Sequence, residues 1–210
     1  MSRPAYKIDT NSPGSDLAAE TAAAMAAGSI AFRNTDQTYA DILLTHAKEL
    51  YQFAEQYRKK YSDSITDARN YYMSSSYNDE LVWGAAWLYK STQDNSYLQK
   101  AEQYFTQFGT GNTGWAFSWD EKNAGAQMLL YELTGKSVYK VAIERSLDAW
   151  LSPGGSVPHT PKGLAWRIQW GPTRYAANTA FLALLAADNG LKVNDYRQFG
   201  EKQINYMLGK

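Results

Sequence analysis

The stretch LVWGAAWLYKSTQDNSYLQKAEQYF, residues 81–105, contains the pattern that decides the fold. Its first part is apolar almost all round and rich in small residues, which is typical of a buried helix. A short polar turn at 93–95 leads into a second segment opened by Tyr97, with Gln, Lys and Glu on one face. One-sided polarity of this kind is typical of an outer amphipathic helix. The stretch therefore predicts a helical hairpin.

The same pattern occurs four times along the chain. The four copies are residues 22–50, 81–105, 126–150 and 176–204, and their second segments open with Tyr39, Tyr97, Tyr139 and Tyr196. No segment alternates strictly enough to predict a β-strand. Repeated helix pairs stack side by side, and each hides the apolar face of its neighbour. We expect an all-α fold, a toroid or solenoid of hairpins with small-residue helices inside and amphipathic helices outside.

The totals exclude several classes of protein. The chain has 210 residues, enough for one domain with a sizeable core, and 21 basic residues balance 21 acidic ones. This balance favours neither a nucleic-acid partner nor an anionic membrane. No apolar run reaches the roughly 18 residues of a membrane span, and the first residues lack the apolar core of a signal peptide. The absence of cysteine excludes disulfides and thiol nucleophiles.

Aromatic residues make up 14% of the chain, with seven Trp and sixteen Tyr. Many of them fall in three long irregular segments, residues 61–78, 109–119 and 152–172, each of which leads into an inner helix. We expect the three segments at one end of the fold, and loops of this kind often carry function. Flat aromatic faces beside polar groups suit sugar rings, whose C–H faces stack while their hydroxyls form hydrogen bonds. The pattern indicates a carbohydrate cleft.

The stretches RPAYKIDTNSPGSDLAAETAAAMAAGS, YNDELVWGAAWLYKST, FSWDEKNAGAQMLLYELTG, TPKGLAWRIQWGPTRYAANTAFLALLAAD and KQINYMLGK resemble glycoside hydrolase family 9. They follow one another in family order from Arg3 to Lys210. The resemblance implies an (α/α)6 barrel, and an endo-β-1,4-glucanase (cellulase) that hydrolyses internal bonds of cellulose-like glucans with inversion. It also implies a secreted, extracellular protein whose partner is a β-1,4-glucan or cello-oligosaccharide.

The motifs that hold the family's catalytic base and acid do not occur in this sequence. We therefore expect residues 1–210 to be a partial catalytic domain, truncated at both ends, with four of six hairpins and no catalytic residue of its own. Exposed flanks of the open arc predict self-association. Two alternatives stay open: a non-catalytic glucan-binding module, and an α-solenoid scaffold whose aromatics anchor another protein.

The resemblance also implies which residues bind glucan. Trp170 is expected to stack on a glucosyl ring, and Arg174 to donate hydrogen bonds near the cleavage site, with Tyr175 beside it. Trp115 is expected as a second platform, whereas Trp119 is expected in the core. The remaining substrate-binding residue is Tyr71, for which Tyr72 could substitute, while Ser74 stands where some members have a cleft Trp. Structural roles for Trp170 and Arg174, in packing and helix capping, are the alternative.

A structural calcium ion is the only cofactor that the resemblance implies, and none is expected for the chemistry. Its ligands would be Ser75, Ser76, Asp79, Glu80 and Asp120, since calcium prefers carboxylate, carbonyl and hydroxyl oxygens. The alternative is a helix start, with Asn78 as N-cap and the acids favoured by the macrodipole. With Asp120 as a calcium ligand, Glu121 would be a solvated acid of a first helical turn.

The two histidines carry little chemistry. His46 lies midway along an outer helix, and His159 lies on an irregular segment, so neither has the spaced partners that a zinc site requires. Asp16 and Glu20 share a helix face, and the resemblance assigns them a structural role.

Overall fold

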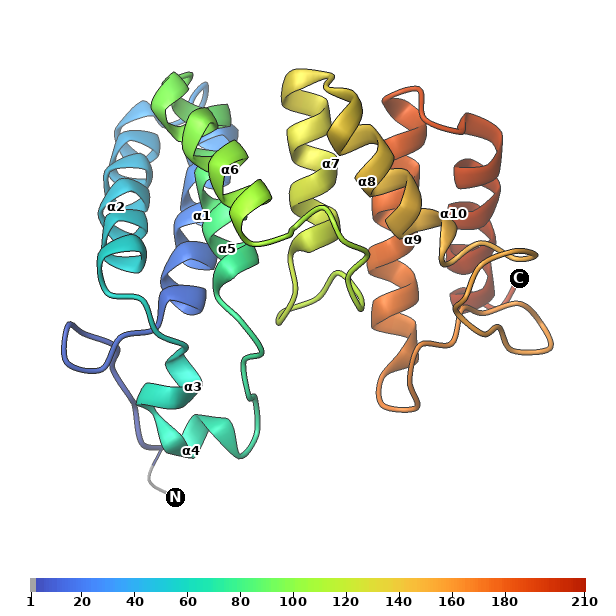
Figure 1. The fold of residues 1–210 in the computed structure, drawn as a ribbon, viewed down its shortest axis with the longest axis horizontal. Helices are drawn as coiled ribbons and strands as arrows, with labels where there is room; N and C mark the ends of the chain where they lie inside the picture. The colour runs from blue at the N-terminus through green and yellow to red at the C-terminus, as the bar shows by residue number, and fades with distance from the viewer. Residues whose placement is uncertain (1–2) are drawn as a thin grey trace. The chain divides into compact units, whose positions relative to one another are not determined.

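The computed structural model describes residues 3–210, and four helical hairpins make up most of that range (Figure 1). Its internal contacts divide the chain into two compact units, Met1–Thr110 (unit 1) and Gly111–Lys210 (unit 2). Within residues 3–210 no β-strand forms, and the one bridge of β type joins His159 to Ala165. No helix in the described range has the length and apolar character that a membrane crossing requires.

Unit 1 holds the first two hairpins and the segment between them. Its helices are α1 (Ser15–Phe32), α2 (Gln37–Gln56), α3 (Tyr61–Ser64), α4 (Thr66–Arg69), α5 (Asn78–Thr92) and α6 (Asn95–Gln107). The inner helix α1 packs against both α2 and α5, and α5 packs against α6. The irregular segment predicted at 61–78 is therefore partly helical, because α3 and α4 each form a single turn within it.

Small residues let the helices of unit 1 approach closely. Gly84 faces α1 and α2, where an added Cβ would lie 2.8 Å from the Tyr51 ring and 3.1 Å from the Ala19 carbonyl oxygen. The Tyr51 hydroxyl donates a hydrogen bond of 2.9 Å to the Leu81 carbonyl oxygen, so a residue of α2 is tied to α5. Side-chain caps begin the outer helices, with Asp36 accepting from the Tyr39 amide and Asp94 from the Ser96 amide.

Unit 2 holds the other two hairpins, α7 (Asn123–Thr134) with α8 (Ser137–Asp148) and α9 (Pro172–Asp188) with α10 (Val193–Met207). The inner helices α7 and α9 contact each other. Its core includes side chains from the long segment between α8 and α9, namely Trp150, Val157, Leu164 and Ala165. Because these residues are buried, the segment is held against the helices instead of projecting as an open loop.

The four predicted hairpins are confirmed, but the inner helices are not buried all round. Leu17 on α1 and Phe181 on α9 are exposed. In unit 2 the segments 111–119 and 152–172 do meet, because the Arg167 guanidinium lies 5.1 Å from the centroid of the Trp115 ring. The place of segment 61–78 at the same end as these two stays a prediction, since it belongs to unit 1.

Candidate glucan-binding site

Aromatic and cationic side chains contact one another at the end of unit 2 where both inner helices begin. The ring of Trp115 meets the ring of Tyr175 edge to face, with centroids 4.9 Å apart and an interplanar angle of 85°. The guanidinium of Arg174 lies 4.5 Å from the Tyr175 centroid, and that of Arg167 lies 5.1 Å from the Trp115 centroid. We call these four residues the Trp115 cluster.

Glu121 fixes the backbone that carries Trp115. Its carboxylate accepts hydrogen bonds from the Trp115 amide at 2.6 Å and the Ala116 amide at 3.4 Å, and from the Asn123 side chain at 3.3 Å. The same carboxylate packs on Gly114, where a Cβ would lie 1.5 Å from an oxygen, so a larger residue there would displace the Glu121 carboxylate. The predicted role of Glu121 as a solvated acid is wrong, because it precedes α7 and closes this turn.

Arg167 was not among the residues predicted from the sequence. Its guanidinium lies between two indoles, 5.1 Å from the Trp115 centroid and 6.0 Å from that of Trp150. Burial lowers the pKa of Arg167, and the nearby Glu121 carboxylate partly offsets this shift. Its Nε atom is buried and has no hydrogen-bond partner among residues 3–210. The planar Arg167 guanidinium therefore packs between the two indoles and holds that of Trp115 in place.

The start of α9 presents Trp170 and Arg174 to solvent. Gly171 adopts the left-handed conformation with φ of 60°, and Pro172 supplies the first helical residue, whose fixed φ suits that position. Trp170 just before this turn is 78% exposed, and Arg174 in the first turn is also exposed. One Arg174 nitrogen donates to the Tyr175 hydroxyl at 2.5 Å, which orients the guanidinium.

Tyr175 is only 4% exposed, so the structure places it beneath Arg174 and beside Trp115 instead of on the open surface. Trp119, which was expected in the core, is 37% exposed, and that prediction is wrong. The physical reason lies in the turn before α7, where the buried Lys122 ammonium donates to the Ser118 and Trp119 carbonyl oxygens at 2.6 and 2.8 Å. These hydrogen bonds hold the turn through its backbone carbonyl groups, and the Trp119 indole lies at the surface.

The predicted unit 1 residue, Tyr71, is 83% exposed, and its alternative Tyr72 is exposed as well. The segment that carries them is anchored through its backbone. Asp16 at the start of α1 accepts from the Tyr61 amide at 2.9 Å, and burial raises the pKa of this carboxyl group while its hydrogen bonds oppose the shift. Asp16 thus has the structural role expected of it. Ser74 is buried and donates to the Ser76 carbonyl oxygen at 2.8 Å.

The predicted calcium ligands fall in both units. Asp79 and Glu80 are buried in the first turn of α5, with Ser75 and Ser76 just before it, whereas Asp120 belongs to unit 2. Within residues 3–210 no group of three or more His, Asp or Glu side chains is close enough to hold a metal ion. Two buried adjacent carboxylates nevertheless suit a hard cation that takes further ligands from carbonyls and hydroxyls.

The helix-start alternative holds in part. Asn78 is the first residue of α5 and Tyr77 the N-cap residue, so Asn78 is not the predicted cap. The amide of Asn78 donates to the Ser76 hydroxyl at 3.0 Å, which places one calcium candidate in the turn that begins the helix.

Neither histidine is a member of the Trp115 cluster. His46 is exposed on α2 with its Nδ1 atom 2.8 Å from the Glu49 carboxylate, as expected for an outer helix. His159 lies on the segment between α8 and α9 and contacts the Val157 carbonyl oxygen at 3.1 Å.

The model of glycosyl hydrolase family 9 matches residues 1–210, and the chain belongs to that family. The all-α (α/α)6 class predicted from the sequence is thereby confirmed.

Named relatives agree with this assignment. Endoglucanase A of Bacillus pumilus is 47% identical over 220 residues, covering all of this chain and 33% of the relative. An endoglucanase structure from the termite Nasutitermes takasagoensis is 54% identical with a TM-score of 0.94, over 98% of this chain and 47% of that one. Endoglucanase CelQ from Clostridium thermocellum, solved with cellotetraose, is 38% identical with a TM-score of 0.86, over 100% and 35%. The chain thus spans between a third and a half of these relatives.

Proposed function

We propose that this chain is part of an endo-β-1,4-glucanase and supplies glucan-binding subsites of its cleft. Two observations carry the proposal: the Trp115 cluster, in which the exposed Arg174 lies over the packed Tyr175 ring, and the exposed Trp170 just before α9. Family membership and the cello-oligosaccharide complex of a 38% identical relative support a β-1,4-glucan as ligand. Family membership alone is the ground for proposing an extracellular protein, which secretion of the natural protein would test.

Each of the predicted substrate-binding residues would have its own role. Trp170 would stack on a glucosyl ring through its exposed face, and Arg174 would donate hydrogen bonds to ring hydroxyls. Trp115 would offer a second, fixed surface. Tyr175 would orient Arg174 from below, since its hydroxyl already accepts from that guanidinium. Tyr71 in unit 1 would contact another glucosyl ring.

Inverting hydrolysis needs one carboxylate to activate a water and one carboxylic acid to protonate the leaving oxygen, about 6.5–9.5 Å apart. We propose that neither is among the carboxylates of this chain. Those of Glu121 and Asp16 already accept backbone amides and serve the fold. The chain would contribute positioning, which matters greatly to rate but does not replace an acid and a base.

A calcium ion bound by Ser75, Ser76, Asp79 and Glu80 would stabilise the start of α5. The position of Asp79 and Glu80 in the first turn of α5 supports this, because carboxylates are oxygen ligands of the kind that calcium prefers. Calcium should then raise the melting temperature of the chain, and the double variant Asp79→Asn/Glu80→Gln should abolish the increase. An unchanged melting temperature with calcium would contradict the site.

Reducing-sugar release from a soluble β-1,4-glucan, with calcium present, tests the proposal. Folded chain should release no more sugar than buffer. Release that is abolished by changing Asp79, Glu80 or Asp120 would show that a catalytic carboxylate had been assigned to calcium. Two alternatives remain as outcomes: a glucan-binding module, and a protein-interaction scaffold with no response to millimolar cello-oligosaccharide. Sedimentation at increasing concentration tests the expected self-association, for which the exposed Leu17 and Phe181 are candidates.

A further inference from the structure

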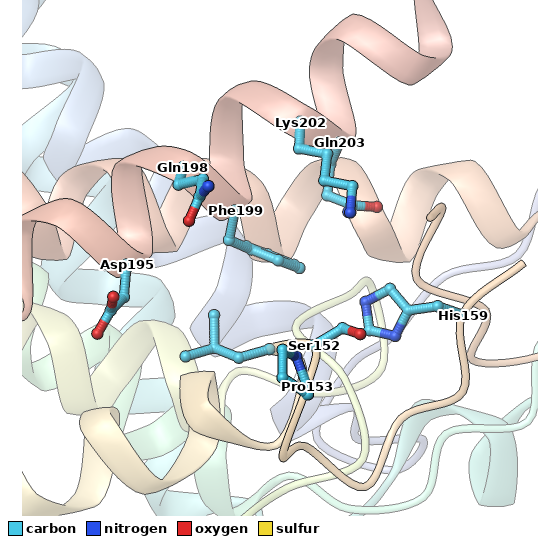
Figure 2. A pocket seen from close by; sticks show the side chains of 9 residues that line it. Ser152, Pro153, His159, Asp195, Gln198, Phe199, Lys202 and Gln203 are labelled. Atoms are coloured by element: carbon cyan, nitrogen blue, oxygen red, sulfur yellow. The ribbon is translucent and has the colours of Figure 1, made fainter. Parts of the chain in front are cut away.

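Unit 2 has a cavity between α10 and the segment that follows α8 (Figure 2). Its volume is about 340 Å³, and none of its lining residues belongs to the Trp115 cluster. Small-molecule pockets in proteins range from about 300 to 1,000 Å³, so this cavity suits a ligand of one or two rings. The glucan site described above makes no use of it.

The walls of this pocket are partly apolar. Figure 2 shows the Phe199 ring of α10 directed into the cavity, with Pro153 on the segment across from it. Phe199 is almost wholly buried by the core of unit 2, so its ring is held in one position. An aromatic ring opposite a pyrrolidine ring offers two flat apolar surfaces, which match the C–H faces of a pyranose.

The rim of the pocket is polar and has no net charge. Asp195, Gln198 and Lys202 come from one face of α10, since they are three and four residues apart, and His159 comes from the opposite segment. Asp195 accepts, Lys202 donates, and Gln198 does both, as the hydroxyls of a sugar require. Burial lowers the pKa of His159, so its ring stays neutral at pH 7. One cation and one anion cancel, which favours a neutral ligand over a charged one.

Hydrogen bonds set the pocket's shape in advance. The fully buried Gln203 of α10 accepts from the Ala165 amide at 2.8 Å and donates to the Gly163 carbonyl oxygen at 3.0 Å. On the other side, the Val157 amide donates to the Ala149 carbonyl oxygen at 2.9 Å. The segment is therefore attached to α10 and to the end of α8, and binding would require little ordering of the backbone.

We propose that this pocket binds a short neutral saccharide of one or two hexose rings, at a site separate from the Trp115 cluster. The pocket's shape and chemistry carry this inference, and only the choice of a β-1,4-glucan saccharide as probe rests on the proposed function. Such a site on an outer helix would hold a glucan end while the Trp115 cluster holds another part of the polymer.

Calorimetric titration with cellobiose tests the proposal in the full 210-residue chain carrying Trp170→Ala and Arg174→Ala, which weaken the cluster. We expect one site with millimolar affinity in this background. Adding Gln198→Ala and Lys202→Met should weaken binding at least tenfold, because two hydrogen-bonding groups are lost. Adding Glu201→Gln and Asn205→Ala, exposed residues of α10 outside the pocket, should leave the affinity unchanged. Circular dichroism confirms that each variant is folded.

Absence of cellobiose binding in the Trp170→Ala/Arg174→Ala chain would overturn the pocket proposal, as would binding that the Gln198/Lys202 pair does not change. Neither result affects the proposed function, which depends on the unaltered cluster. Conversely, binding that depends on the pocket pair but not on Trp170 and Arg174 would support the pocket and contradict the cluster. Galactose binding with the same affinity as cellobiose would show that the pocket selects sugars by shape alone. That result would still support a short neutral saccharide as the ligand.

Discussion

The aromatic residues of the two units are held in different ways. In unit 2, the Trp115 ring contacts the Tyr175 ring and the Arg167 guanidinium. The Glu121 carboxylate fixes the backbone there, because it accepts a hydrogen bond from the Trp115 amide. In unit 1, the backbone near Tyr71 is anchored by Asp16 and by the Tyr61 hydroxyl, which donates to the Tyr72 carbonyl oxygen, while the Tyr71 ring is mostly in solvent.

The difference concerns preorganisation. An aromatic platform that already has fixed neighbours loses little rotamer entropy when a sugar covers it, whereas an exposed ring on a segment loses more. We therefore expect unit 2 to contribute most of the affinity for glucan, and unit 1 to add a weaker contact. The predictions below test this contrast, beginning with the largest effect.

Glu121→Ala should have the largest effect, because it leaves the Trp115 and Ala116 amides without their acceptor and Arg167 without its nearby anion. Hydrogen bonds to charged groups contribute about 1.5–3 kcal/mol each, so we expect a loss of about 3 kcal/mol in the free energy of unfolding. Urea denaturation measures it. Glu201→Ala, at an exposed site on α10, is the control and should change stability by less than about 0.5 kcal/mol. Equal effects of the two changes would refute the structural role of Glu121.

Trp170→Ala should weaken cellotetraose binding about tenfold. If a sugar ring covers about 60 Å² of the indole, the loss at about 25 cal/mol per Å² is about 1.5 kcal/mol. Since the side chain is 78% exposed, the melting temperature should not change. Calorimetry and thermal melts of the same sample separate the two effects. Trp119→Ala, which removes a partly exposed Trp from the same unit, should leave the affinity intact; if it matters as much as Trp170, the site is misplaced.

Arg167→Lys should weaken binding by about three- to fivefold. Lysine keeps the charge but loses the flat group between the indoles of Trp115 and Trp150, and cation–π contacts contribute about 0.5–2 kcal/mol. A shift in the tryptophan emission maximum would report the movement of Trp115. Arg197→Lys on α10 serves as control, because it retains the ion pair to Asp188. Unchanged emission together with unchanged affinity would rule out a positioning role for Arg167.

Alkaline pH should destabilise both units alike. Burial raises the pKa of Tyr51 in unit 1, and burial with the Asp148 carboxylate raises that of Tyr196 in unit 2. Above about pH 10 the unfolded tyrosines lose their protons while the folded ones keep theirs, so the free energy of unfolding falls as pH rises. Tyr51→Phe and Tyr196→Phe should each reduce this slope, and Tyr39→Phe at an exposed site should not. A slope unaffected by either buried change would contradict the burial.

Tyr71→Ala should have the smallest effect, at most a twofold loss of affinity for cellotetraose and no change in stability. Its phenol ring, 83% exposed, is smaller than the Trp170 indole, so a sugar that covers it buries less apolar area. Calorimetry beside the Trp170→Ala variant gives the comparison directly, with Tyr72→Ala as the matched change. A loss as large as that of Trp170→Ala would reverse the proposed ranking of the two units.

The hairpins were predictable because their apolar spacing, turn residues and caps are local. Asp94 begins α6 and Gly135 ends α7, in both cases through contacts within a few residues. The site was less predictable. Arg167 contacts Trp115 although the two residues are 52 positions apart in the sequence. The Trp119 indole lies at the surface because the Lys122 ammonium holds the turn through its carbonyl oxygens. Periodicity cannot reveal such contacts, which is why Arg167 was missed and the roles of Trp119 and Glu121 were wrong.

Titration of tryptophan fluorescence with cellotetraose, in the unaltered chain and in Arg174→Ala, tests the glucan-binding role of the Trp115 cluster most directly. We predict a saturable change in emission for the unaltered chain and a midpoint at least tenfold higher for the variant, because a charged donor is lost. No change at millimolar cellotetraose in a folded sample, or the same midpoint in both chains, would contradict the assignment of this cluster to glucan.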